Sequence, residues 1–292
     1  MNNTLGAENK PTYIRQRYLL AFLNQLNEPL QMTYIQKLVF LNEKACGKEY
    51  YDFVPYKYGP YSFQLAEDLD ILTKRGFVSR NSGRFEPITG IDFENIQFIS
   101  KERGDELIRK AYREYPYYAI NSEILEKLFT REEAAFLKKS GTTSERTNPV
   151  LFTIGYEGRS IEEFINTLIF NNISALCDVR KNPLSRKFGF SNRNLAHILP
   201  QIGIKYYSIT GLGIDSEKRN DLETKEDYIC LFSDYAGTLN RRTVFLDEVY
   251  KLYKMHNRIA LMCYEKDPQM CHRHVIRDYM VEKDDSIVSE DL

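Results

Sequence analysis

The N-terminal part of the chain shows apolar residues at helical spacing, interrupted by short breaks. Apolar side chains recur every three or four positions over 13–27, 32–45 and 62–75, which predicts three amphipathic helices. Each stretch ends near a glycine or a proline, the residues that stop helices. Segment 50–60 contains two prolines among many tyrosines, so it is predicted to be an extended connector.

Two short runs follow over 77–88, separated by an Asn-Ser-Gly turn, and predict a β-hairpin. Three helices followed by a hairpin is the order of a winged-helix domain, whose third helix usually enters the major groove of DNA. Basic residues gather at the helix end and hairpin, while acidic residues lie along the helix: Lys74, Arg75, Arg80 and Arg84 against Glu67, Asp68 and Asp70. The sequence therefore leaves both a nucleic-acid and a protein partner open.

Helical periodicity resumes over 101–115, 121–129 and 131–139, and the last of these starts with Thr130 and Glu133 at the spacing of a capping box. Segment 140–149 then lacks any apolar residue and is predicted to be a linker. The predicted organisation is a helical winged-helix-like domain at 11–139, the linker, and a second domain at 150–292.

Strand and helix patterns alternate regularly in the second domain. Strands are predicted over 150–156, 173–179, 205–209 and 258–263, with helical segments over 160–172, 192–203, 217–256 and 272–282. Such alternation is typical of an α/β domain, a Rossmann-like parallel sheet covered by helices. The predicted fold class is therefore an α/β C-terminal domain preceded by a mainly α winged-helix domain.

Polar and basic residues follow the predicted strands, where the loops of an α/β sheet border its ligand crevice. A phosphate, sulfate or nucleotide is the favoured ligand class for so cationic an edge. The predicted anion- or substrate-binding residues are Gly155, Tyr156, Arg180, Arg186, His272 and Arg273.

Reactive side chains stand in the same loops, and Glu265, Cys263, Cys271 and Asp178 are the candidate catalytic residues. Glu265 could stabilise an oxocarbenium-like centre in N-glycosidic cleavage, by analogy with the carboxylates of glycosidases. Either cysteine could attack as a thiolate beside Arg273 and a helix start. The plain alternative for Asp178 is an ion pair with Arg180.

The arrangement of cysteines and histidines argues against a metal. Cys263 and Cys271, near His272 and His274, are separated by seven residues, whereas structural zinc sites usually place two to four between their cysteines. We therefore expect no metal and no cofactor. Cys177 and Cys230 lie in apolar contexts and are predicted to be core thiols.

The amino-acid composition restricts the partners and the cellular location that we expect for the protein. A net charge of -1 and a pI near 6.5 give no global attraction to nucleic acid or to an anionic membrane. Five cysteines suit a reducing compartment, and no apolar run approaches the roughly 18 residues that span a bilayer. The expected location is the cytoplasm, without membrane association.

Two resemblances add to this picture. Ile35-Gln36-Lys37-Leu38, Tyr56-Lys57-Tyr58-Gly59-Pro60 and Leu65-Ala66-Glu67-Asp68-Leu69 resemble the SocA-like, or Panacea, antitoxin-type domain. That resemblance implies a protein-binding or regulatory module in toxin–antitoxin or phage-defence settings. Thr153-Ile154-Gly155-Tyr156, Asp178-Val179-Arg180, Cys263-Tyr264-Glu265-Lys266-Asp267-Pro268 and Cys271-His272-Arg273 resemble the domain of unknown function 488 family, which implies no agreed activity.

Two functions follow as hypotheses. The first is an enzyme, a hydrolase or transferase acting by N-glycosidic cleavage or cysteine chemistry on a phosphorylated or nucleic-acid-derived substrate, in phage defence or nucleic-acid metabolism. A rhodanese-like sulfur transfer fits less well, because no compact cysteine loop closes on an arginine. The second is a non-catalytic regulator that binds DNA or protein and senses an anionic ligand through its α/β domain.

Overall fold

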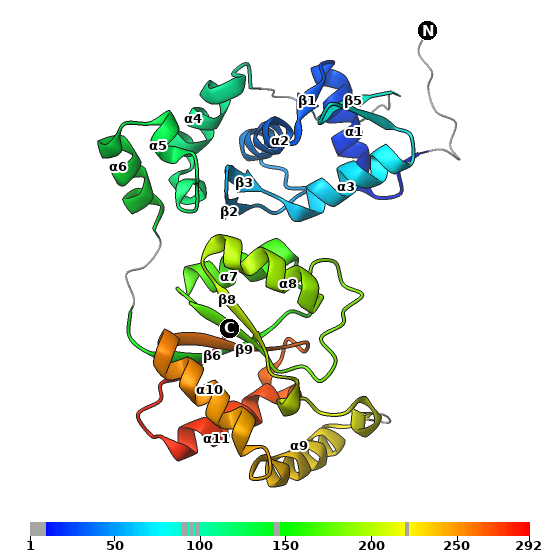
Figure 1. The fold of residues 1–292 in the computed structure, drawn as a ribbon. Helices are drawn as coiled ribbons and strands as arrows, with labels where there is room; N and C mark the ends of the chain where they lie inside the picture. Colours follow the sequence, from blue (N-terminus) through cyan, green and yellow to red (C-terminus); the bar gives the residue numbers. More distant parts are fainter. Residues whose placement is uncertain (1–9, 89–92, 94–95, 97–99, 143–146, 220–221) are drawn as a thin grey trace. The chain divides into compact units, whose positions relative to one another are not determined.

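A computed structural model describes residues 10–88, 93, 96, 100–142, 147–219 and 222–292 (Figure 1). The chain divides into two compact units, Met1–Thr143 and Ser144–Leu292. Residues 143–146 of the predicted linker lie outside the described residues. Within those ranges no helix combines the length and apolar character that a bilayer crossing requires.

The N-terminal unit begins with three helices and a small antiparallel sheet. The helices are α1 (Ile14–Leu26), α2 (Met32–Cys46) and α3 (Phe63–Lys74), and the strands are β1 (Leu30–Gln31), β4 (Val78–Asn81) and β5 (Arg84–Pro87). Strand β5 lies between β1 and β4. Ser82 and Gly83 form the turn of the hairpin with positive φ angles, as a tight two-residue turn requires. The three helices and the hairpin therefore lie where the sequence predicts them.

The connector between α2 and α3 is extended, as predicted, and it also forms a hairpin that the sequence did not reveal. Its strands are β2 (Val54–Tyr56) and β3 (Gly59–Tyr61). The amide of Gln36 donates to the Ser62 carbonyl at 2.9 Å and accepts from the Ser62 N–H at 2.8 Å. Lys37 is buried and donates to the Pro60 carbonyl at 3.3 Å, and burial lowers its pKa to about 7. Long-range polar contacts, rather than local pattern, hold this hairpin on α2.

The unit is completed by α4 (Gly104–Glu114), a 3-10 turn (Pro116–Ala119), α5 (Leu125–Leu128) and α6 (Arg131–Gly141). The helix predicted over 121–129 is wrong for most of its length. Asn121 donates to the Pro55 carbonyl and the Glu123 N–H donates to the Lys57 carbonyl, so the chain follows the β2–β3 hairpin there. The capping box at Thr130 is present, with reciprocal bonds to Glu133.

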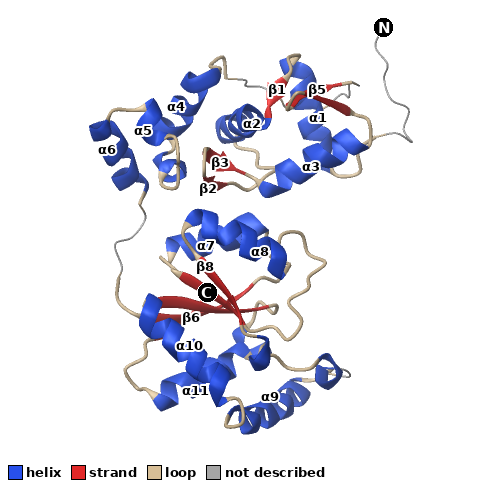
Figure 2. Ribbon diagram, viewed as in Figure 1, coloured by secondary structure: helices blue, strands red, loops and turns tan. Residues whose placement is uncertain are grey.

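The C-terminal unit is built on a five-stranded parallel sheet in the described part of the chain (Figure 2). The strands are β6 (Val150–Gly155), β7 (Ala175–Asp178), β8 (Lys205–Ser208), β9 (Arg258–Cys263) and β10 (Ser289–Asp291), in the order β10-β6-β9-β7-β8. All neighbouring pairs are parallel. The three central strands are buried throughout, which is typical of a parallel sheet covered on both faces. The predicted α/β architecture is confirmed.

Helices cover both faces of this sheet (Figure 1). Helices α7 (Ile161–Phe170) and α8 (Asn192–Ile198) lie on one face, and α10 (Thr243–His256) and α11 (Arg273–Lys283) lie on the other, with α9 (Lys225–Leu239) against α11. The chain moves one way along the sheet from β6 to β8 and the other way from β8 to β10. Right-handed crossovers place the helices of the two directions on opposite faces. The reversal opens a crevice at the carboxyl ends of β6 and β9.

Three details of the second unit differ from the predictions. The edge strand β10 was missed because its three residues are exposed and carry no apolar pattern. The single helical segment predicted over 217–256 is a 3-10 turn followed by two helices, α9 and α10. Cys177 is a core thiol as predicted, but Cys230 on α9 is exposed.

One charged residue of α3 is part of the core of the N-terminal unit. The Asp68 carboxylate is buried and accepts hydrogen bonds from Arg15 at 2.6 Å, Gln16 at 2.8 Å and Tyr51 at 3.2 Å. The bonds join α3 to α1 and to the segment before β2. Asp68 therefore does not belong to the exposed acidic face that the sequence suggested.

Replacing Asp68 with alanine should lower the free energy of unfolding by roughly 2 to 4 kcal/mol, because the buried Gln16 and Tyr51 and the partly exposed Arg15 lose their acceptor together. Urea denaturation of the whole chain measures the change. Glu67→Ala, one position along the same helix, is the matched control and should change it by less than about 0.5 kcal/mol. Equal stabilities of the two variants would contradict this role for Asp68.

Candidate functional site

The candidate site lies where β9 ends and α11 begins. Ile259 and Leu261 belong to the apolar core beneath α10 and α11, and strand alternation puts Cys263 on that same face. The chain then passes through a short 3-10 turn and reaches Cys271 and His272 immediately before α11. The fold therefore returns Cys271 and His272 to the thiol of Cys263.

Arg273 holds this loop in place. Its side chain is completely buried and donates from Nε to Thr153 Oγ1 at 3.1 Å, from Nη1 to the Glu265 carbonyl at 2.6 Å and from Nη2 to the Lys266 carbonyl at 3.1 Å. One guanidinium thus ties the loop after β9 to strand β6. The sequence predicted an anion-binding role for Arg273, but the structure places all three of its nitrogens on the protein.

Gly155 allows the loop to lie this close to β6. A Cβ atom at this position would stand 1.9 Å from the Glu265 carbonyl oxygen, far inside any real contact distance. Of the two readings open for this glycine, backbone room for a close approach is the one that the geometry supports. Here the approaching group is the protein's own loop.

His272 is the centre of the reactive cluster. Its Nε2 lies 3.0 Å from the Val179 carbonyl, which can only accept, so Nε2 carries the proton in the neutral ring. Nδ1 is then the accepting nitrogen of the ring, and it lies 3.7 Å from Cys263 Sγ and 3.9 Å from Cys271 Sγ. All three side chains are buried, with exposed fractions of 2% or less. The fixed tautomer therefore leaves an accepting nitrogen close to both thiols.

Arg219 joins the cluster from the 3-10 turn Ser216–Arg219, and sequence reasoning missed it. It donates to Glu265 Oε1 at 2.9 Å and to His272 Nδ1 at 3.0 Å. Burial by itself raises the pKa of the Glu265 carboxyl, but a hydrogen bond from Cys271 and the charge of Arg219 outweigh it, so that pKa lies below its ordinary value. Glu265 is therefore ionised at neutral pH. Arg219 stands in a polar segment without a strand before it, so no strand-end signal pointed to it.

Asp178 and Arg180 form a second buried group beside the cluster. Arg180 donates from Nε and Nη2 to the two oxygens of Asp178 at 2.8 and 2.6 Å, and from Nη1 to Tyr156 OH at 2.9 Å. Tyr206 OH donates to the same carboxylate at 2.7 Å. With its oxygens already occupied and no exposed surface, Asp178 is placed as the partner of Arg180 rather than at a reacting centre.

A cavity of about 150 Å³ opens beside these residues. Its lining combines Cys263 and His272 with three cationic side chains, and none of the described residues that line it is acidic. The lining residues are Tyr156, Arg180, Lys181, Asn182, Ile214, Arg219, Cys263, Tyr264 and His272. Arg186 is exposed on the loop before α8 and lies outside this lining, as do Cys271 and Arg273.

One sequence family matches the part of the chain that contains most of the residues lining this cavity. Residues 160–280 match the family described as Domain of unknown function DUF488. The match includes strands β7, β8 and β9 and the clustered residues from Asp178 to Arg273, and it leaves out β6 and β10. It does not extend to the N-terminal unit, whose resemblance to SocA-like antitoxin domains stays a prediction. Searches of curated proteins and of solved structures gave no match.

Cys263 and Cys271, the two cysteines of the cluster, differ in their surroundings. Cys263 lines the cavity, whereas Cys271 is fully buried behind it. Burial raises the pKa of the Cys271 thiol well above its ordinary value, and the neighbouring Cys263 raises it further. Of the two predicted nucleophiles, only Cys263 therefore borders a space that a substrate could enter.

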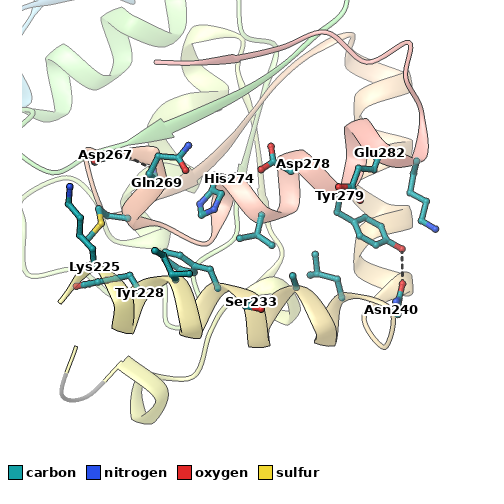
Figure 3. A pocket seen from close by; sticks show the side chains of 17 residues that line it. Lys225, Tyr228, Ser233, Asn240, Asp267, Gln269, His274, Asp278, Tyr279 and Glu282 are labelled. Atoms are coloured by element: carbon teal, nitrogen blue, oxygen red, sulfur yellow. Dashed lines mark hydrogen bonds between the residues drawn. The ribbon is translucent and has the colours of Figure 1, made fainter. Parts of the chain in front are cut away.

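A larger groove of about 880 Å³ lies elsewhere in the DUF488 region, between α9 and α11 (Figure 3). Phe232 of α9 packs edge-on against the ring of His274 of α11, with centroids 5.1 Å apart, and the Tyr279 hydroxyl of α11 reaches Asn240 at 3.5 Å. None of the predicted catalytic or anion-binding residues lines it. Its size therefore does not make it the site of the chemistry.

Arg273→Lys should lower the free energy of unfolding by about 2 to 4 kcal/mol, because one ammonium cannot reach three acceptors arranged as a fork. Chemical denaturation measures it. Arg277→Lys, one turn later on α11 and in ion pairs with Asp278 and Asp291, should change it by less than about 1 kcal/mol. If Arg273→Lys left the free energy of unfolding unchanged, the hydrogen bonds of the guanidinium would not be what holds the loop in place.

Proposed function

We propose that the C-terminal unit is an enzyme, a hydrolase or transferase, that acts on a small phosphate ester. The Cys263 thiolate would attack phosphorus and break its bond to the ester oxygen, the alcohol would leave, and water or another acceptor would then take the phosphoryl group from sulfur. The observation that carries this proposal is the lining of the 150 Å³ cavity, where three cations and a cysteine–histidine pair meet without an acidic side chain among the described residues. Cationic clefts favour phosphate, sulfate and nucleotide ligands. The cavity would hold a phosphate-sized group rather than a whole nucleotide.

The geometry of His272 supports a role as general base. A nucleophilic cysteine needs a nearby base, and the base needs a third group to orient it. Nδ1 of His272 is 3.7 Å from Cys263 Sγ, and the bond from Nε2 to the Val179 carbonyl holds the ring in the accepting tautomer. Once Arg219 Nη2 withdraws from Nδ1, proton transfer from the thiol to Nδ1 would leave a thiolate near the Arg219 guanidinium, whose positive charge would stabilise it.

Arg219, Lys181 and Arg180 are the candidates for binding the anion. Arg219 is held by Glu265 and Lys181 by Asp215 at 2.9 Å, so both charges are positioned at the cavity wall by carboxylates that lie outside it. Arg180 already donates from all three of its nitrogens, to Asp178, Tyr156 and the Phe190 carbonyl, so it adds fixed positive charge to the wall rather than a free edge for the anion.

The alternative mechanism gives Glu265 the central role, as the carboxylate that stabilises an oxocarbenium-like centre in N-glycosidic cleavage. Its ionised state suits that role, but it does not line the cavity and its Oε1 is paired with Arg219. We therefore assign Glu265 to positioning Arg219. Glu265→Gln should then weaken substrate binding more than it slows turnover.

Selective alkylation tests the nucleophile without a known substrate. In chelator-treated protein, the ratio of the rates with iodoacetate and iodoacetamide should be about fivefold or more higher at Cys263 than at the exposed Cys230, because the cationic wall attracts the carboxylate reagent. Peptide mass spectrometry reads both cysteines in the same chain. Arg219→Gln should reduce the ratio at Cys263 and leave Cys230 unchanged.

A screen of phosphomonoesters and nucleotides then tests turnover. An activity of this site should fall about 10³-fold or more in Cys263→Ser and persist in Cys230→Ser. Activity that survives in Cys263→Ser but disappears in Glu265→Gln would favour N-glycosidic cleavage. Equal reagent ratios at Cys263 and Cys230 would count against the cationic thiol site itself.

For the N-terminal unit we propose a protein-binding role for a winged-helix-type module. Three helices followed by a hairpin, with β1 added beside β5, support the winged-helix assignment. A protein partner is favoured because α3 carries the partly exposed Glu67 and Asp70, and Asp70 approaches Arg80 of the hairpin at 3.8 Å. The phosphate backbone of DNA would meet acidic charge along that helix.

Duplex DNA should therefore bind the full chain no more tightly than about 10 μM at physiological salt, the range of weak non-specific contact. Fluorescence anisotropy with a labelled duplex measures this. Asp70→Lys should strengthen the binding if the same face is the one presented. Submicromolar binding with a steep salt dependence would instead support a DNA-reading domain.

A further inference from the structure

Cys263, Cys271 and His272 have the composition of a soft-metal site as well as of a thiol centre. Two thiols and an imidazole are a ligand set of catalytic zinc sites. Their sulfur atoms and Nδ1 all lie within 4.8 Å of one another, and all three residues are buried. We infer that these three side chains bind a zinc-class divalent ion.

The distances fit tetrahedral coordination. With zinc–sulfur bonds of about 2.3 Å and zinc–nitrogen bonds of about 2.0 to 2.1 Å, tetrahedral geometry separates sulfur from nitrogen by about 3.6 Å. The observed separations from His272 Nδ1 are 3.7 Å to Cys263 Sγ and 3.9 Å to Cys271 Sγ. Both values are within a few tenths of an ångström of the ideal, so the ligands need little movement.

The contact of the other ring nitrogen supports the same reading. Histidine ligands of metals almost always donate their second N–H to a carbonyl or carboxylate, which fixes the ring. His272 Nε2 makes that bond to the Val179 carbonyl at 3.0 Å, and leaves Nδ1 for the metal. The same contact that would make His272 a base would make it a ligand.

The wide spacing of Cys263 and Cys271 in the sequence no longer argues against a metal site once the fold is known. The rule of two to four intervening residues applies to ligands on one tight turn. Here Cys263 ends a strand, while Cys271 and His272 stand at the start of the helix that packs on the same face of that strand. Sheet and helix packing bring together what the chain separates by seven residues.

Arg219 is the group that competes with the metal. Its Nη2 lies 3.0 Å from His272 Nδ1, and it must withdraw from Nδ1 for the ion to enter. The Glu265 carboxylate, bonded to Nη1, is the partner that remains for the displaced guanidinium, and zinc with two thiolates is neutral. The fourth coordination position would face the cavity that Cys263 and His272 line.

Metal binding and thiol chemistry exclude each other, because both need the Cys263 thiolate and Nδ1 of His272. A zinc-class ion would therefore switch off the proposed nucleophile, and its removal would restore it. The metal site itself does not depend on the proposed function, since it needs Cys271, which the nucleophilic mechanism does not use.

Cobalt and zinc titrations of the full, reduced, chelator-stripped chain test the site. Co²⁺ should give the intense visible bands and thiolate charge-transfer absorption of tetrahedral sulfur coordination, saturating at one ion per chain. Zn²⁺, measured against a chromogenic chelator, should displace it. Cys271→Ser should weaken Zn²⁺ binding by at least about 100-fold. Cys230→Ser is the matched control and should bind as the wild type does.

Two further readouts separate the metal site from the proposed function. Arg219→Ala should bind Zn²⁺ more tightly, because it removes a competing cation, while it loses the iodoacetate preference at Cys263. Zn²⁺ should protect Cys263 from iodoacetate in the wild type but not in Cys271→Ser. A normal cobalt spectrum without the iodoacetate preference would retain the metal site and reject the nucleophile.

If Cys271→Ser fails to fold, X-ray absorption spectroscopy of the zinc-loaded wild type still tests the metal ligands. Two sulfur ligands and at least one nitrogen ligand are expected. An octahedral cobalt spectrum, fewer than two sulfur ligands, or Cys271→Ser binding Zn²⁺ as tightly as Cys230→Ser would each overturn the inference.

Discussion

The bond network of a single buried guanidinium fixes the loop that joins Cys263 to Cys271 and His272. Arg273 donates to Thr153 on β6 and to the carbonyls of Glu265 and Lys266, and so fastens the loop after β9 across the top of the sheet. The loop can lie there only because position 155 has no side chain. Without this fastening the spacing between Cys263 and the first residues of α11 would not be defined.

Because the loop is fixed, the cluster of Cys263, Cys271 and His272 suits two different uses, thiol catalysis and metal binding. A preformed arrangement of two thiols and an oriented imidazole is what thiol catalysis and soft-metal binding both require, since each uses the lone pair of Nδ1 and a deprotonated sulfur. Arg219 controls access to Nδ1 for both uses. While it donates to His272 Nδ1 it occupies the lone pair that the thiol proton and the metal ion both need, and it must move away before either can use it. The competition is electrostatic, because a guanidinium and a divalent cation cannot share one acceptor.

Carboxylates behind the cavity wall determine which arginines face it. Asp178 fixes Arg180, and Glu265 fixes Arg219, while neither carboxylate lines the cavity. This arrangement leaves the wall cationic although the chain as a whole has a formal charge of -1. A local field of this kind depends on which partner each charge finds, and not on composition. Asp68 in the N-terminal unit illustrates the same point, because its partners remove it from a surface that the sequence would have called acidic.

The sequence by itself determined the features that depend on local physics. Periodicity and capping placed α7 after Ser160, the four longer strands and the loops at their carboxyl ends, because neighbouring residues decide those elements. It also pointed to Cys263, Glu265 and His272. Only the tertiary structure decided that Arg273 is a fastening, that Arg219 belongs to the cluster and that β10 completes the sheet. Those outcomes depend on contacts between segments far apart in the chain, and burial and pairing of a charge are properties of such contacts rather than of any local pattern.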